Sequence, residues 1–146
     1  MSPAREPASG PPLHEHVFRL SYGDTDPAGI LYYGAWLPRM EALQSEWLLF
    51  QGLRQDTLAK RFGWWTVSRA SECEYLEAAR LFDEIRIELR MGRIGTTSLQ
   101  FEFEMWRLAD GVRVGRGSNT IVTVSPELVP IPIPDDFRTR LDEWAA

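Results

Sequence analysis

The chain has 146 residues, a length typical of one domain, and 44% of them are hydrophobic, which is enough for a sizeable core. The net charge is −5 and the arginines are dispersed, so the chain lacks the basic stripe of a nucleic-acid-binding protein, and we expect no nucleic-acid partner. No apolar run approaches the roughly 18 residues that cross a membrane. The single cysteine, Cys73, excludes an intrachain disulfide bond. These features favour a cytoplasmic protein without membrane spans.

The first twelve residues differ in composition from the rest of the chain. Residues 1–12 are rich in proline, alanine, serine and glycine and lack the apolar segment of a signal peptide. Such a composition cannot bury enough apolar surface to fold. We therefore predict a disordered extension over residues 1–12 and one folded domain over residues 13–146.

The first predicted elements are a short strand and an apolar helix. Alternation over residues 17–22 predicts a strand that places Phe18, Leu20 and Tyr22 on one face. Over residues 35–51, large apolar side chains recur at the three- and four-residue spacings of a helix: Leu37, Met40, Leu43, Trp47 and Leu48. Because Pro38 is tolerated only within about the first turn, the helix must start shortly after Tyr33. A helix this apolar is usually wrapped by a sheet.

Strands dominate the second half of the chain. After a short helix over residues 56–62, alternating or β-rich stretches predict strands over residues 64–75, 83–90, 97–107 and 112–124. Residues 92–95 indicate a turn, Ala109-Asp110-Gly111 is a hairpin signal, and Gly115 and Gly117 are typical of a bulge. A C-terminal helix, capped by Asp135 or Asp136, is predicted over residues 135–145. One strand, one helix and four consecutive strands favour an α+β layer with an antiparallel sheet.

Between the first strand and the apolar helix lies a stretch that suits neither structure. Residues 23–33 hold two carboxylates, two glycines, a proline and two tyrosines. Carboxylates before a helix start lie near backbone N–H groups that have no intrahelical partner. Asp26 could be a reactive group, or it could form an Asx turn or a helix cap, since Asp-Pro is a common turn dipeptide. For Asp24 we favour a role in stabilising the turn.

Residues 22–33, YGDTDPAGILYY, resemble the loop motif of the 4-hydroxybenzoyl-CoA thioesterase family of the hotdog fold. Residues 75–83, the turn at 95–98 and the proline-rich stretch after the last strand are weaker matches. The resemblance covers about residues 16–138. It implies a five-stranded antiparallel sheet wrapped around a central helix, and a dimer with paired sheets, often within a homotetramer. It also implies a hydrolase that cleaves acyl-CoA thioesters, with coenzyme A as part of the substrate and no other cofactor.

The same resemblance assigns roles to two residues of the motif. Asp26 matches the catalytic carboxylate, and the backbone N–H of Tyr33 matches the group that polarises the thioester carbonyl. A carboxylate can attack that carbonyl to form a mixed anhydride, or it can activate a water molecule. Both routes stay open. Gly29 would let the backbone fold back between the two groups, and Tyr32 could line the acyl pocket or simply pack.

Substrate binding is less determined by the sequence. Arg93 and Arg116 are candidates for contacts to the phosphates of coenzyme A, because a planar guanidinium matches phosphate oxygens. The turn near Arg93 lacks the basic run found in well-known members with aromatic substrates, so an acyl-carrier-protein thioester is an alternative. The acyl group, aromatic or of short or medium length, stays undetermined. A non-catalytic hotdog module that binds an acyl ligand or a carrier protein is the alternative function.

The remaining ionisable groups are weaker candidates for catalysis or metal binding. Glu41 on the helix could replace the loop aspartate, as in another branch of hotdog thioesterases, although a surface or dimer contact is favoured. His14 and His16 are the only histidines, and we expect them on the surface or in the tail. Because histidines are so few and Cys73 stands alone, we expect no metal site. The long strand edges favour pairing between chains, hence a dimer or tetramer.

Overall fold

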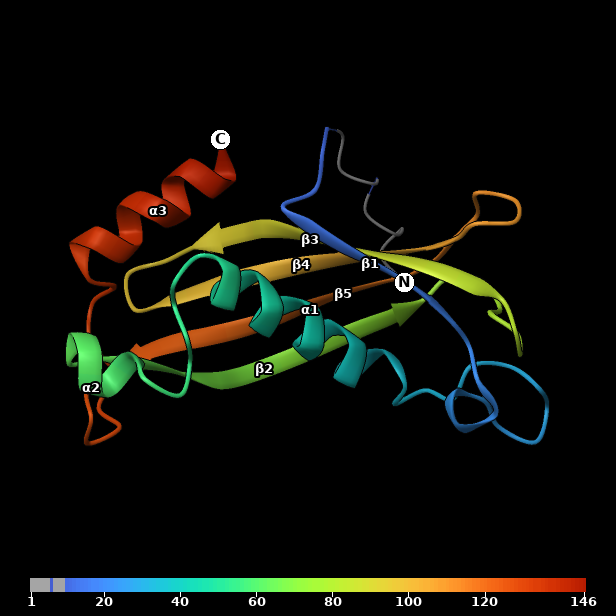
Figure 1. Ribbon diagram of the computed structural model, residues 1–146, viewed down its shortest axis with the longest axis horizontal. Helices are drawn as coiled ribbons and strands as arrows, with labels where there is room; N and C mark the ends of the chain where they lie inside the picture. The colour runs from blue at the N-terminus through green and yellow to red at the C-terminus, as the bar shows by residue number, and fades with distance from the viewer. Residues whose placement is uncertain (1–5, 7–9) are drawn as a thin grey trace.

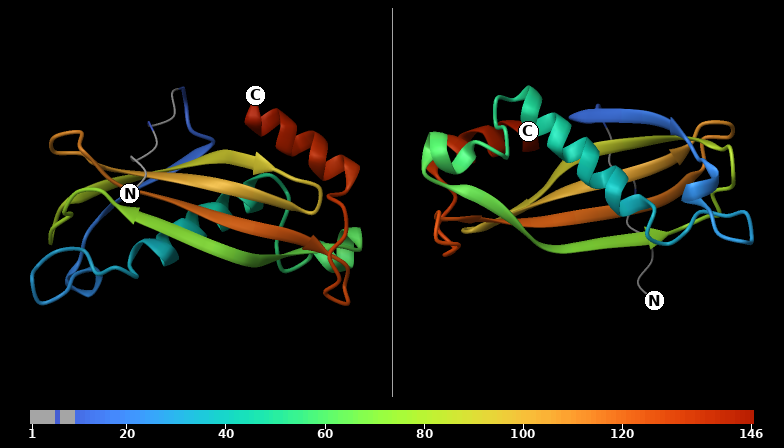
Figure 2. Two further views of the ribbon diagram at one scale, coloured as in Figure 1. Left: turned by 180° about the vertical axis from the view of Figure 1, so that it is seen from behind. Right: turned by 60° about the horizontal axis from the view of Figure 1, so that its bottom comes forward.

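The computed structural model describes residue 6 and residues 10–146 of the chain. One helix, α1, lies against a five-stranded sheet, and two shorter helices lie at one end of it (Figures 1 and 2). The elements in chain order are β1 (His14–Arg19), the 3-10 turn η1 (Tyr22–Asp24), α1 (Trp36–Phe50), α2 (Leu58–Phe62), β2 (Trp65–Tyr75), β3 (Glu84–Ile94), β4 (Ser98–Arg107), β5 (Arg113–Val124) and α3 (Asp135–Ala145). The predicted α+β class is confirmed.

The sheet is antiparallel throughout, with strand order β1-β3-β4-β5-β2. Phe103 at the centre of β4 pairs with Leu89 of β3 on one side and with Gly117 of β5 on the other. Strands β3, β4 and β5 follow one another in sequence and in space, whereas β1 and β2 are the two edge strands. The predicted sheet of five strands around a central helix is therefore confirmed.

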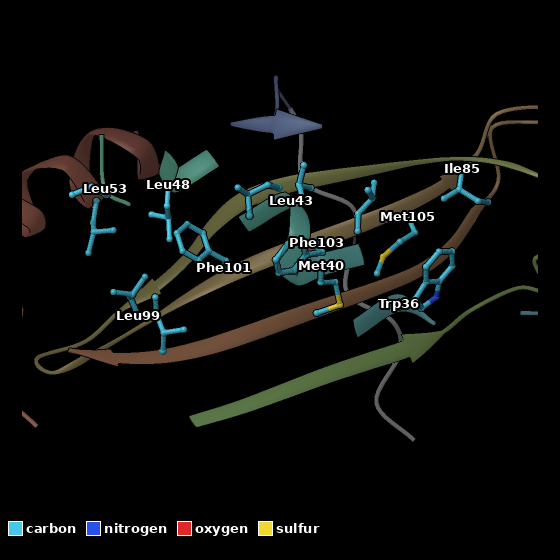
Figure 3. Packing of buried hydrophobic residues seen from close by; sticks show 14 of the residues in the cluster. Trp36, Met40, Leu43, Leu48, Leu53, Ile85, Leu99, Phe101, Phe103 and Met105 are labelled. Carbon is cyan, nitrogen blue, oxygen red and sulfur yellow. The ribbon is translucent and has the colours of Figure 1, made fainter. Parts of the chain in front are cut away.

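The core lies between α1 and the face of the sheet that it covers (Figure 3). Alternate residues of a strand point to the same face, and those that face the helix are fully buried: Ile85, Ile87 and Leu89 of β3, and Leu99, Phe101, Phe103 and Met105 of β4. The helix contributes Trp36, Met40, Leu43 and Leu48. Helix α1 begins at Trp36 and contains Pro38 in its first turn, as the sequence predicted.

Two glycines of β5 allow α1 to approach the sheet closely. A Cβ atom on Gly115 would lie 2.9 Å from Trp36 Nε1, and one on Gly117 would lie 2.7 Å from Met40 Sδ. A register shift between β4 and β5 does occur nearby, between Met105 and Trp106. Gly115 thus lies beside the register shift that the glycines led us to expect, but the main effect of both glycines is to make room for α1.

The other face of the sheet carries ion pairs of low exposure. Arg113 Nε lies 2.8 Å from Glu104 Oε2, and both side chains are about nine-tenths covered. Burial raises the pKa of the Glu104 carboxyl, an effect that the nearby Arg113 opposes. Glu88 is also buried on this face and accepts a hydrogen bond of 2.7 Å from Trp106 Nε1. Glu88 and Glu104 alternate with the core residues of β3 and β4, so they lie on the face of the sheet opposite α1.

Three predicted boundaries were wrong. The first strand is His14–Arg19 rather than residues 17–22, because Asp24 accepts hydrogen bonds from the N–H and hydroxyl of Ser21 and starts the η1 turn. Tyr22 is consequently 83% exposed instead of facing the core. Strand β3 continues to Ile94 through a register shift after Met91, where a turn was predicted.

The ends of the chain complete the fold. Helix α3 has the predicted bounds, but Pro134 occupies its N-cap and no side chain caps it. Most of the predicted extension over residues 1–12 lies outside the described residues. Within residues 10–12, the Gly10 carbonyl accepts a hydrogen bond of 2.8 Å from Arg90 Nη2. No helix in the described part of the chain is both long and apolar enough to cross a membrane.

Candidate active site

The loop between η1 and α1 folds into a tight turn around Asp26. The Asp26 N–H donates to the Ile30 carbonyl at 3.0 Å, and the Gly29 N–H donates to the Asp26 carbonyl at 2.9 Å. Gly29 has φ +74°, a left-handed conformation that glycine adopts without strain. The expectation that Gly29 lets the backbone fold back is confirmed by this geometry. These hydrogen bonds hold the backbone of Asp26 in place and so fix the position of its Cα atom.

A second segment, residues 75–83, anchors this loop. The Leu31 N–H donates to the Ala79 carbonyl at 2.7 Å, and the Leu81 N–H donates to the Gly29 carbonyl at 3.1 Å. The sequence singled out residues 75–83 only as a weak match to the family, without a role. The structure shows that this segment follows β2 and forms one wall of the site.

The two segments, together with the start of α1, enclose a cleft of about 470 Å³. This volume lies within the range of small-ligand sites. Apolar and aromatic side chains dominate the lining, and Asp26 and Glu77 supply carboxylates. The lining residues are Asp26, Ile30, Leu31, Tyr33, Trp36, Tyr75, Leu76, Glu77, Ala78, Ala79 and Val114. Asp26 and Tyr33, the two predicted catalytic residues, are therefore brought to one cleft.

Asp26 forms the Asx turn, which is one of the roles that the sequence left open. Its Oδ1 accepts a hydrogen bond of 2.8 Å from the Ala28 N–H, which is the Asx turn. Its other oxygen, Oδ2, has no hydrogen-bond partner among residues 10–146. One oxygen thus fixes the orientation of the carboxylate, and the residue lines the cleft.

Tyr33, whose backbone N–H is the predicted oxyanion donor, also lines the cleft. The Tyr32 N–H donates to the Asp24 carbonyl and the Ala35 N–H donates to the Tyr32 carbonyl, whereas the Gly34 N–H has no partner among residues 10–146. Across the described part of the chain, the Tyr33 N–H has no partner. Helix α1 starts three residues later, at Trp36. This N–H therefore precedes the helix rather than belonging to its first turn.

Tyr75 and Trp36 also line the cleft, and for Tyr75 the sequence did not predict this position. The Tyr75 hydroxyl donates a hydrogen bond to the Tyr33 carbonyl and so ties the end of β2 to the loop. Burial raises the pKa of Tyr75, which keeps the donor protonated. Trp36 is 1% exposed and packs edge-on against Phe18. In the sequence, only the weak family match over residues 75–83 indicated that this segment borders the site.

The other predicted site residues lie elsewhere. Tyr32 packs against the ring of Tyr33 with 4.7 Å between centroids but does not line the cleft. Arg93 is exposed near the β3–β4 turn. Arg116 lies between Gly115 and Gly117, which face α1, so its side chain is on the opposite face, 2.5 Å from Glu74. The cleft of this chain therefore contains neither predicted arginine.

Glu41, Cys73 and the two histidines also lie outside the cleft. Glu41, the alternative catalytic carboxylate, is exposed and accepts a hydrogen bond from Ser45 outside the cleft. Cys73 lies 3.5 Å from Met40 Sδ, in line with a packing role, and burial raises the pKa of its thiol. His14 and His16, expected on the surface or in the tail, lie in β1 with partly exposed side chains that face Glu46 of α1.

Comparison with known proteins places this arrangement in a family. A sequence profile of the thioesterase-like superfamily matches residues 20–141. The chain belongs to this superfamily, and the resemblance noted in the sequence is confirmed. The acyl-CoA thioesterase YbgC of Haemophilus influenzae is 27% identical over 89 residues, which are 61% of this chain. The match spans 65% of that relative's length.

Solved structures with this fold include several thioesterases. A 1,4-dihydroxy-2-naphthoyl-CoA thioesterase from Synechocystis superposes with a TM-score of 0.77 at 16% identity, covering 91% of this chain and 98% of that one. A gentisyl-coenzyme A thioesterase gives a TM-score of 0.72 at 20% identity, covering 87% and 98%. A Staphylococcus aureus protein in complex with CoA gives a TM-score of 0.79 at 11% identity, covering 95% and 88%. At these identities the likeness concerns the fold, which is that of hotdog thioesterases.

Proposed function

We propose that this chain hydrolyses an acyl-CoA thioester in the cleft described above, with Asp26 as nucleophile or general base and the Tyr33 N–H as oxyanion donor. The observation that carries the proposal is the pairing of these two groups in one cleft. A carboxylate oxygen and a backbone N–H without a partner are the complementary groups that acyl transfer needs. Membership of the thioesterase-like superfamily supports the same reaction.

Two routes use the same groups. In the nucleophilic route, Asp26 Oδ2 bonds to the carbonyl carbon and the carbon–sulfur bond breaks. Coenzyme A leaves as a thiolate that takes up a proton, and water then cleaves the mixed anhydride and regenerates the carboxylate. In the general-base route, Asp26 takes a proton from a water molecule while the water oxygen bonds to the carbonyl carbon. The carbon–sulfur bond then breaks, and the coenzyme A thiolate takes up the proton, which leaves Asp26 ionised again. In both routes the carbonyl oxygen becomes negative and accepts a hydrogen bond from the Tyr33 N–H.

The lining of the cleft favours an apolar acyl group with a ring. Tyr33, Trp36 and Tyr75 border it, and aromatic side chains pack well against planar groups. Two of the similar structures are named for aromatic acyl-CoA substrates, which agrees with this preference. The complex of a third with CoA supports coenzyme A as the carrier. Of the two predicted arginines, Arg93 is the better candidate for the phosphates because Arg116 already pairs with Glu74.

We also propose that the chain works as a dimer or tetramer. Strand β2 forms one edge of the sheet, pairing only with β5, and its middle residues 68–72 are exposed. An edge of eleven residues presents backbone groups that a second copy can pair with. Residues from a second chain would then supply the contacts to coenzyme A that the cleft of one chain lacks.

A panel of thioesters tests the proposed reaction. Purified protein is incubated with aromatic, short, medium and long acyl-CoAs, and with one acyl group carried by acyl-carrier protein, while the released thiol is measured. We expect turnover of at least one acyl-CoA, with aromatic groups preferred over long chains. Faster turnover of the acyl-carrier-protein thioester than of the matching acyl-CoA would mean that acyl-carrier protein, and not coenzyme A, carries the substrate. Binding of an acyl-CoA without hydrolysis of any panel member would instead establish a binding module.

A further inference from the structure

A cluster of three metal-ligating side chains lies outside the cleft. His14 and His16 are two residues apart on β1, so they share one face of the strand, and that face meets Glu46 on α1. His14 Nε2 lies 2.6 Å from Glu46 Oε2, and His16 Nε2 contacts the same oxygen. The candidate ligand atoms of the three residues all lie within 4.8 Å of one another. None of the three lines the cleft.

Packing holds this cluster in place while leaving it accessible. The His14 ring stacks edge-on against Phe50 at 5.4 Å and lies 6.1 Å from the Trp47 ring. The His16 ring packs edge-on against His14. The side chains of His14, His16 and Glu46 are 21%, 34% and 38% exposed. The rings are therefore oriented before any ligand arrives, and an ion can reach them from solvent.

We propose that His14, His16 and Glu46 bind a divalent transition-metal ion of the Zn²⁺ type. Two imidazole nitrogens and one carboxylate oxygen suit Zn²⁺, whereas Mg²⁺ and Ca²⁺ prefer oxygen ligands alone. Three protein ligands leave a fourth position for water. The ion takes the place of the proton between each Nε2 and Glu46 Oε2, and each neutral imidazole keeps its single proton on Nδ1 while Nε2 binds the ion.

Such an ion would join an edge strand to the central helix. Strand β1 pairs only with β3, and β1 contacts the helix on the face that carries the histidines. An ion that binds the folded chain and not the unfolded one stabilises the fold by an amount that grows with the logarithm of its concentration once the site is mostly occupied. The site therefore acts on stability, and it is independent of the reaction proposed for the cleft.

The test uses the full chain, produced without a polyhistidine tag and stripped of metal with a chelator. Zn²⁺ is titrated by calorimetry, and Co²⁺ is followed by its visible absorption, which is intense for four-coordinate sites. We expect one ion per chain, a four-coordinate Co²⁺ spectrum, and a melting temperature that rises with Zn²⁺. Because these are the only two histidines in the sequence, an imidazole-dependent signal cannot come from elsewhere.

Variants assign the ion to the cluster. Glu46→Gln and His16→Asn should each weaken Zn²⁺ binding at least roughly tenfold, since each removes one of three ligands. Glu15→Gln is the matched control: Glu15 lies between the histidines but is exposed on the other face of β1, and binding should stay within about twofold. Wild-type protein that gives no four-coordinate Co²⁺ spectrum would overturn the proposal. So would Glu46→Gln and His16→Asn proteins that bind Zn²⁺ as well as wild type.

Discussion

At the scale of single residues, Asp26 combines a local role with a proposed chemical one. Its Oδ1 closes the Asx turn with the Ala28 N–H, and its Oδ2 has no partner within residues 10–146. Sequence reasoning treated the turn and catalysis as alternatives. The structure allows both, because a carboxylate has two oxygens and the turn uses one. A reactive group held in this way loses little orientational freedom when the substrate binds.

The proposed oxyanion donor is a backbone group, so only a change that removes the N–H should affect it. We expect Tyr33→Pro to lower kcat by about 10²- to 10³-fold, the cost of losing one such donor. Tyr33→Phe keeps the N–H and should retain kcat within roughly threefold. Steady-state kinetics on the best substrate, with circular dichroism to check folding, compares the two.

Tyr75→Phe is a second variant in case proline distorts the loop. It removes the hydroxyl that binds the Tyr33 carbonyl and should lower kcat less than Tyr33→Pro does. The role of the N–H is refuted if the folded Tyr33→Pro enzyme keeps wild-type kcat, or if Tyr33→Phe loses as much as Tyr33→Pro.

The buried ion pair between Arg113 and Glu104 should make the free energy of unfolding of an Arg113 variant depend on pH. Arg113→Met leaves the carboxylate of Glu104 buried without its partner at 2.8 Å and should cost about 3 kcal/mol at pH 7.5. The pKa of Glu104 is raised by burial, so its protonated form is the better tolerated one, and the penalty grows as pH rises through the folded-state pKa. The deficit should therefore shrink as pH falls toward 5.

Urea unfolding of both proteins at several pH values measures this difference. Arg69→Met is the control, because Arg69 is exposed on β2 and its loss should change stability by less than about 0.5 kcal/mol. A deficit for Arg113→Met that does not depend on pH would mean that Arg113 stabilises the fold through packing and not through Glu104.

At the scale of elements, the contact between α1 and β5 depends on glycine. A Cβ on Gly117 would lie 2.7 Å from Met40 Sδ and 2.9 Å from the Glu72 carbonyl oxygen. The methionine can move, but the backbone carbonyl belongs to the paired strand β2. We expect Gly117→Ala to destabilise the protein by about 1–3 kcal/mol in denaturant unfolding.

Gly23→Ala tests whether this effect is local. A Cβ on Gly23 would meet only Ser21 Oγ, at 3.9 Å. This variant should therefore stay within about 0.5 kcal/mol of wild type. Equal stability of the Gly117→Ala and wild-type proteins would show that the helix can shift away from β5.

Elements with a strong period could be predicted from the sequence, and elements set by local hydrogen bonds could not. The alternation in β4 and the apolar spacing of α1 gave bounds close to those observed. The hydrogen bonds of Asp24 to Ser21, in contrast, override the alternation that seemed to extend the first strand to Tyr22. The shift after Met91 likewise keeps β3 in the sheet past a glycine that suggested a turn.

At the scale of the whole molecule, the exposed edge of β2 predicts self-association. Light scattering coupled to size exclusion should give a mass of at least twice the 16.8 kDa of one chain. The mass is measured over a dilution series, because a weak contact dissociates at low concentration. A monomer at all concentrations would leave the edge of β2 unpaired and would contradict the proposed assembly.

The site could be predicted only where it is contiguous in sequence. Asp26, Gly29 and Tyr33 lie within eight residues, so one motif identified them. Tyr75 and Glu77 reach the cleft because residues 79–81 bond to the loop across some fifty positions of sequence. The meeting of His14 and Glu46 likewise requires the packing of β1 against α1. No periodicity within either segment specifies such a contact.

Asp26 is the residue that we propose performs the chemistry, and a comparison of the two carboxylates of the cleft tests this role. Asp26→Asn and Glu77→Gln are each assayed for thiol release from the best acyl-CoA, with folding checked by circular dichroism. We expect Asp26→Asn to lower kcat by at least about 10³-fold, as loss of a nucleophile or base does, whereas Glu77→Gln should lower it by less than roughly tenfold. A folded Asp26→Asn enzyme that turns over its best substrate at the wild-type rate would contradict it.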